Sequence, residues 1–128
     1  MGDTPRVLVV EDDLSVQEII VEICASVGAE VVAMADGQKA IDLLGRESFG
    51  LVMTDLHLPG RTGDHVARFT RERHPGTKVV LLSATWSDDE RVRALYIPCD
   101  LLVPKPFTVD HITEVVRRFL VLPAAPVP

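Results

Sequence analysis

The chain alternates short, continuously apolar runs with longer segments whose apolar residues recur at helical spacing. The clearest apolar runs span 7–10, 51–53, 79–82 and 101–103, and a weaker one spans 31–34. Runs without polar alternation suit strands that helices cover on both faces, as in a parallel sheet, better than half-exposed antiparallel strands. The pattern therefore predicts five parallel strands.

Glycines and capping residues mark the ends of the helices expected between these strands. The first predicted helix ends at Gly28, and the second begins after Asp36-Gly37 and ends at Gly45. Three more are predicted to begin at Thr62, near Ser87 or Asp88, and after Thr108. Strict alternation of strand and helix with short connections requires right-handed crossovers. We therefore predict an α/β fold, a doubly wound five-stranded parallel sheet with helices on both faces.

The length of the chain bounds its organisation. A chain of 128 residues that is 47% hydrophobic has the size and composition for a single core. We predict one folded domain over 1–122 and a proline-rich tail or linker stub over 123–128, because a helix cannot continue past those prolines. Such a tail fits a free-standing protein and a domain of a longer protein equally well.

The charge and hydropathy of the chain exclude two classes of partner. A net charge of −6 argues against direct nucleic-acid binding, which needs clustered Lys and Arg. No apolar segment approaches the roughly 18 residues of a membrane span, and no signal peptide is recognisable at the start. We therefore expect a cytoplasmic protein without a membrane or direct nucleic-acid partner.

Polar and charged residues stand where the predicted strands end. They are Glu11, Asp12 and Asp13 after the first strand, Asp55 after the third, Ser83 after the fourth and Lys105 after the fifth. Ligands of doubly wound folds bind at these carboxyl ends, and acidic groups that converge there repel one another unless a cation lies between them. Oxygen ligands without a suitably spaced His or Cys favour Mg²⁺ over zinc. The sequence therefore predicts a magnesium site at this edge of the sheet.

A carboxylate beside Mg²⁺ and a lysine can act as a nucleophile toward a phosphoryl group, because both cations neutralise charge on the phosphoryl oxygens. Asp55, at the end of the third predicted strand, is the candidate acceptor. Asp13 fits an N-cap of the following helix as well as it fits a site residue. Ser83 or Lys105 alone would be an ordinary structural residue, so the prediction depends on all these groups sharing one edge.

The polar strand ends form a series of motifs with a characteristic order. In sequence they are Glu11-Asp12-Asp13, the loop 55–63, Ser83-Ala84 and Lys105-Pro106-Phe107. Any one of them is weak evidence, but with this order and these separations the chain resembles a response-regulator receiver domain over about 6–122. The resemblance implies a flavodoxin-like (βα)5 fold with strand order 2-1-3-4-5, and an aspartyl phosphate formed in a two-component phosphorelay.

The resemblance also implies a role for each residue around the metal. Asp12 would bind Mg²⁺ directly together with Asp55, whereas Glu11 would act mainly through a coordinated water. The backbone carbonyl of His57 would be the third protein ligand, so the imidazole of that residue need not contact the metal.

The remaining site residues would act on the phosphoryl group. Lys105 would pair with the acceptor and then with the phosphoryl group, and its bond to Pro106 would be cis. Ser83 would move inward to donate a hydrogen bond to a phosphoryl oxygen. The chief departure from the family is Leu102, where an aromatic residue often swings inward with the hydroxyl. Aromatic gating is therefore not expected in this chain.

The partners follow from the same resemblance. A histidine kinase or a histidine phosphotransfer protein would donate the phosphoryl group. A downstream protein would bind the face made by the fourth helix, the fifth strand and the fifth helix. The family also uses this face for dimers, and the sequence does not decide whether this chain forms one. The domain would catalyse only its own phosphorylation and dephosphorylation, and would not be an enzyme toward other substrates.

Two other functions compete with the switch. A phosphatase of the haloacid dehalogenase type also uses a strand-end aspartate and Mg²⁺, but it needs a second acid two residues later, where this chain has His57. A pure interaction module would keep the fold without the switch, as Leu102 makes conceivable. The intact set of acidic residues, hydroxyl and lysine argues against that module.

Overall fold

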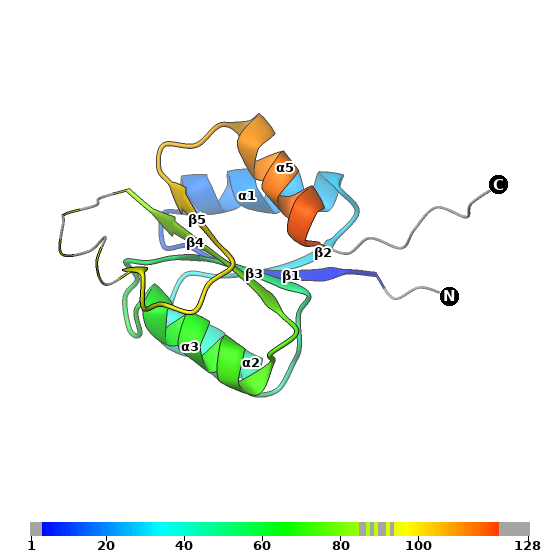
Figure 1. The fold of residues 1–128 in the computed structure, drawn as a ribbon. Coiled ribbons are helices and arrows are strands. Elements are labelled where there is room, and N and C mark those ends of the chain that lie inside the picture. Colours follow the sequence, from blue (N-terminus) through cyan, green and yellow to red (C-terminus); the bar gives the residue numbers. More distant parts are fainter. Residues whose placement is uncertain (1–3, 85–86, 88, 90–91, 93, 121–128) are drawn as a thin grey trace.

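The computed structural model describes residues 4–84, 87, 89, 92 and 94–120. In chain order the elements are β1 (Arg6–Val10), α1 (Leu14–Ser26), β2 (Glu30–Met34), α2 (Gly37–Leu44), β3 (Leu51–Asp55), α3 (Gly63–Arg73), β4 (Lys78–Ser83), β5 (Leu101–Pro104) and α5 (Val109–Phe119). The strands form one parallel sheet in the order β2-β1-β3-β4-β5 (Figure 1). Both the predicted fold class and the implied strand order are confirmed.

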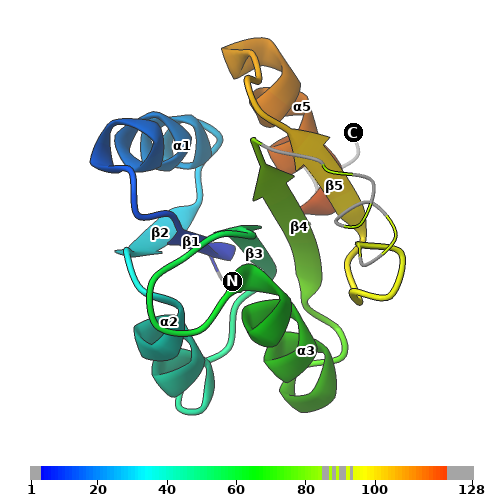
Figure 2. The same ribbon diagram turned by 90° about the vertical axis from the view of Figure 1, so that its left-hand side faces the viewer.

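Helices cover both faces of this sheet. Figures 1 and 2 show α1 and α5 on one side of the strands and α2 and α3 on the other. Successive residues of β1 point to opposite faces. Val7 and Val9 pack in the core beneath α1 and α5, and Leu8 and Val10 pack in the core beneath α2 and α3. Because both faces are buried, the strands read as unbroken apolar runs.

Side-chain caps begin most of the helices. Asp13 accepts hydrogen bonds from two backbone N–H groups of the first turn of α1, and Asp36 does the same for α2. Thr108 caps α5 by accepting one hydrogen bond, from the backbone N–H of His111. Thr62 precedes α3 as predicted, but its hydroxyl bonds to the side chain of Asp64 rather than to the backbone. Asp13 is thus a helix cap, and the acidic group found among the described residues consists of Glu11, Asp12 and Asp55.

Two predicted segments fall outside the described residues. The fourth helix was expected to start near Ser87 or Asp88, and residues 85–86, 88, 90–91 and 93 are not described. The tail over 123–128 is not described either. Both expectations stay predictions. Among the helices that the structure does describe, none is long and apolar enough to cross a membrane.

Candidate functional site

Three strands bring Glu11, Asp55 and Lys105 together at the carboxyl edge of the sheet. Because β1 and β3 are parallel neighbours, Glu11 follows β1 beside the end of β3, where Asp55 lies. The Lys105 Nζ donates to Asp55 Oδ2 over 3.0 Å and also to Glu11 Oε1. The predicted meeting of these residues is confirmed, although they are separated by up to 94 positions in the sequence.

Asp12 completes an acidic cluster at this edge. One carboxylate oxygen from each of Glu11, Asp12 and Asp55 lies within 4.8 Å of the others. Glu11 is fully buried, Asp55 is 7% exposed, and Asp12 is exposed. Within the described residues the buried Glu11 Oε2 has no hydrogen-bond partner. Buried oxygens of this kind are normally satisfied by water or an ion. An all-oxygen donor set with an open oxygen fits Mg²⁺ and its bound waters.

The cluster sets three carboxylates against a single lysine amine among the described residues. Burial raises the pKa of Glu11 to about 7, hydrogen bonding with Asp55 adds to the rise, and Lys105 opposes it. Burial by itself lowers the pKa of Lys105, but the hydrogen bonds to Glu11 and Asp55 outweigh burial, and the pKa is raised. Lys105 therefore stays charged. The site can still accept further positive charge, which a divalent cation would supply.

The loop after β3 contacts the carboxylate oxygen of Asp55 that Lys105 does not contact. The backbone N–H of His57 donates to Asp55 Oδ1 over 3.2 Å. Gly63, the first residue of α3, lies so close that a Cβ there would be 2.1 Å from the Asp55 carbonyl oxygen. The loop thus folds tightly back onto the acceptor. The side chain of His57 is exposed, and the proposed role of its backbone carbonyl stays a prediction.

Ser83 and the residues after β5 complete the edge. Ser83 is fully buried at the end of β4, one position beyond Leu82, which is the register partner of Asp55. The Ser83 carbonyl accepts the backbone N–H of Lys105 over 2.7 Å, which ties the ends of β4 and β5 together. The peptide bond between Lys105 and Pro106 is cis, as the resemblance implied. Ser83 is therefore placed beside the acceptor strand.

Leu102 lies in the middle of β5, away from the acidic cluster. It is half-buried and packs against a small core on the α3 side of the sheet that includes Leu56, Leu81 and Ile97. An aliphatic side chain thus occupies the position where the family often carries an aromatic ring. Its contacts are those of an ordinary core residue.

Gln17 is the functional candidate that the sequence did not reveal. From the first turn of α1 its side-chain Nε2 donates to the carbonyl of Glu11 over 2.9 Å and to the carbonyl of Met34 over 3.3 Å. A single glutamine on a helix is unremarkable in a sequence. The contact follows from how α1 packs over two strand ends, so no local pattern could have predicted it.

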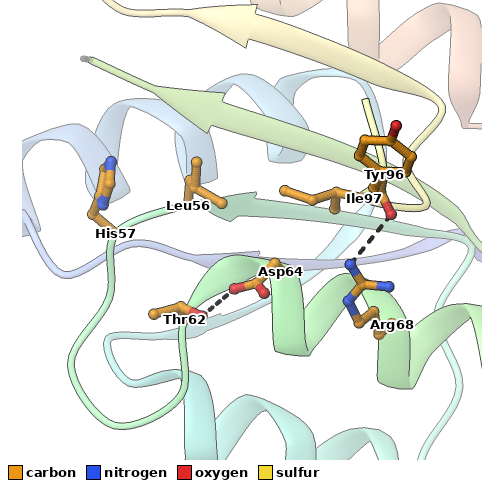
Figure 3. A pocket seen from close by; sticks show the side chains of 7 residues that line it. All are labelled: Leu56, His57, Thr62, Asp64, Arg68, Tyr96 and Ile97. Atoms are coloured by element: carbon orange, nitrogen blue, oxygen red, sulfur yellow. Dashed lines mark hydrogen bonds between the residues drawn. The ribbon is translucent and has the colours of Figure 1, made fainter. Parts of the chain in front are cut away.

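A cleft of about 470 Å³ borders the site on the α3 side. Leu56 and His57 line one end, and Arg68, Tyr96 and Ile97 line the other (Figure 3). In Figure 3 the guanidinium of Arg68 reaches across to the backbone carbonyl of Tyr96, over 3.2 Å. The described lining includes none of the three clustered carboxylates. The cleft is therefore a neighbour of the acidic cluster and not the cluster itself.

Known proteins resemble this chain in sequence. The family model of the response regulator receiver domain matches residues 7–117. The response regulator protein FleR of Pseudomonas aeruginosa is 32% identical over 113 residues, which are 88% of this chain and 24% of FleR. The transcriptional regulatory protein CpxR of Escherichia coli K12 is 30% identical over 115 residues, which are 90% of this chain and 49% of CpxR. The chain thus spans half or less of the length of these relatives.

The likeness extends to solved structures. The BeF3-activated receiver domain of DrrB, a Thermotoga maritima protein, superposes with a TM-score of 0.81 at 27% identity, covering 91% of this chain and 97% of that domain. Sequence and structure therefore agree over nearly the whole described fold. The chain belongs to the response regulator receiver domains, the phosphorylation switches of two-component systems.

Proposed function

We propose that Asp55 is the phosphoacceptor of this receiver domain and that Mg²⁺ assists the transfer. Asp12, Asp55 and the backbone carbonyl of His57 would bind the ion, and Glu11 would act through a coordinated water. The observation that carries the proposal is the cluster of three carboxylates within 4.8 Å, with the amine of Lys105 on Asp55. Of the three clustered carboxylates, only that of Asp55 belongs to the last residue of the central strand β3.

The residues of the site divide the work of phosphoryl transfer. A carboxylate oxygen of Asp55 forms the new bond to phosphorus while the bond from phosphorus to the donor's imidazole nitrogen breaks, and that imidazole takes up a proton. Lys105, already paired with Asp55, neutralises charge on the transferred group. Ser83 then donates its hydroxyl to a phosphoryl oxygen. Mg²⁺, when bound, supplies further neutralisation of the equatorial oxygens.

The proposed partners follow from membership in the family. A histidine kinase or a histidine phosphotransfer protein would donate the phosphoryl group in the cytoplasm. Phosphorylation would then shift the population of states at the face formed by the fourth helix, β5 and α5. A downstream protein, or a second copy of the chain, would read that face. We also propose that the receiver domain spans 1–122 and that 123–128 form a tail or linker stub.

Incubation with Mg²⁺ and acetyl phosphate, followed by intact-protein mass measurement, tests the proposal. The wild-type chain should gain one phosphoryl group, and Asp55→Asn should gain none. Asp13→Asn is a matched control, because it removes a neighbouring acid while Asn can still cap α1. Labelling of Asp55→Asn at the wild-type rate would refute the assignment. Multiple turnover of an external phosphoester would instead support an enzyme.

A further inference from the structure

The carboxyl ends of β1 and β2 are joined by a side chain that comes from neither strand. Gln17 is the fourth residue of α1, and helical side chains point back toward the helix N-terminus. Its amide therefore lies over the strand ends, where Nε2 contacts the carbonyls of Glu11 and Met34. The backbone N–H of Glu11 also donates to the Met34 carbonyl, over 3.0 Å. The half-buried amide of Gln17 thus bridges the carbonyl groups of Glu11 and Met34 by hydrogen bonds.

This bridge holds the peptide unit that carries the acidic pair. The Glu11 carbonyl belongs to the peptide bond between Glu11 and Asp12, so the hydrogen bond from Gln17 restrains how that peptide plane is rotated. The rotation decides the direction in which Asp12 leaves the backbone. Asp12 is exposed, and its carboxylate contributes one oxygen to the cluster. The Glu11–Asp12 peptide therefore sets the position from which this carboxylate reaches the cluster.

We infer that Gln17 is a positioning residue for the metal site, and this inference rests on the proposed binding of Mg²⁺ by Asp12. By holding the Glu11–Asp12 peptide, the amide pre-orients the exposed ligand without touching the ion. Residues that orient metal ligands typically change metal affinity about 10- to 100-fold when they are removed. Because Gln17 acts on the backbone and not on the carboxylate, the expected effect is smaller, about three- to tenfold.

Gln17→Met is the test, because methionine keeps the length of the side chain but donates no hydrogen bond. Calorimetric titration with Mg²⁺ should give a dissociation constant about three- to tenfold higher than that of the wild type. The backbone amide resonance of Asp12 should shift in the metal-free protein. Ser26→Ala is the control, since it removes a side-chain hydrogen bond, to the Ile23 carbonyl, at the other end of α1. The control should leave the affinity unchanged.

A second variant guards against an effect of methionine on folding. Gln17→Asn retains an amide but is one methylene shorter, so it should not span both carbonyls and should also weaken binding. Wild-type affinity in both variants, together with a large loss in Asp12→Ala, would overturn the inference and leave the proposed metal site intact. If the wild-type chain binds no Mg²⁺, or if Asp12→Ala binds it as well as the wild type, the proposed site itself fails.

Discussion

At the scale of single residues, the tasks proposed for Asp12 and Lys105 should be separable. Asp12→Ala removes the proposed anionic ligand, so it should weaken Mg²⁺ binding by more than about tenfold and slow phosphorylation to a similar extent. Lys105→Ala removes a cation that pairs with Asp55, so it should slow phosphorylation while sparing Mg²⁺ affinity. Titration of both variants with Mg²⁺, paired with acetyl phosphate labelling rates, measures the difference. Equal losses of affinity would contradict the division of roles.

Asp100 is a residue-scale prediction outside the site. Its Oδ2 accepts the backbone N–H of buried Val79 over 2.8 Å and the guanidinium of Arg71 over 2.9 Å. Burial raises the pKa of Asp100, but the hydrogen bonds to Val79 and Arg71 outweigh burial and lower the pKa below its ordinary value. Asp100→Ala should cost about 1–3 kcal/mol at neutral pH, because the N–H of Val79 loses its partner.

The sign of the pH dependence follows from the lowered pKa of Asp100. A carboxyl whose pKa is lower in the folded state stabilises the fold above its unfolded pKa, and this contribution is lost as the pH falls through the folded pKa. The free energy of unfolding of the wild type, measured by urea denaturation, should fall between neutral pH and about pH 4 or below, in part because this contribution is lost. The Asp100→Ala variant should lack that part of the pH dependence. Parallel curves for the two proteins would show that the carboxylate contributes nothing.

At the scale of elements, the start of α2 is packed against the loop that follows Asp55. The N–H of Gly37 donates to the Pro59 carbonyl over 3.1 Å, and a Cβ on Gly37 would lie 1.6 Å from the carbonyl oxygen of Arg61. Gly37→Ala should therefore destabilise the fold by about 1–3 kcal/mol or more, although Gly→Ala in a helix is ordinarily stabilising. Gly76→Ala is the control, because no atom lies within 4 Å of its added Cβ. Denaturant unfolding that ranks the two variants equally would refute the packing argument.

At the scale of the whole molecule, the switch should couple site occupancy to stability. A ligand that binds only the folded state raises the free energy of unfolding, by about 2.7 kcal/mol at one hundred times its dissociation constant. Beryllofluoride with Mg²⁺ should therefore raise the melting temperature of the wild type, and Asp55→Asn should show no such rise. Ser83→Ala should show a smaller rise, since the proposed hydroxyl donor to the mimic is lost. Fluoride with Mg²⁺ but without beryllium is the control, and an equal rise there would contradict specific binding.

Much of the architecture could be predicted from the sequence because it depends on local patterns. Burial of both sheet faces requires unbroken apolar strands such as 7–10, and a cap needs only the residue at one position, as with Asp36 and Thr108. The parallel sheet then places the polar residues that end its strands at one edge. The strand order, by contrast, was expected from the family resemblance and not from periodicity.

The tertiary structure alone decided how residues from different elements meet. Gln17 bridges two strand ends, Asp100 satisfies the N–H of Val79, and Gly37 touches the backbone of Arg61. Each of these contacts joins residues from different elements through one backbone group, so it has no sequence period and no characteristic residue type. The sequence by itself determined which groups reach the edge of the sheet. Only packing between distant segments determined their orientation, because orientation depends on distances that no local pattern encodes.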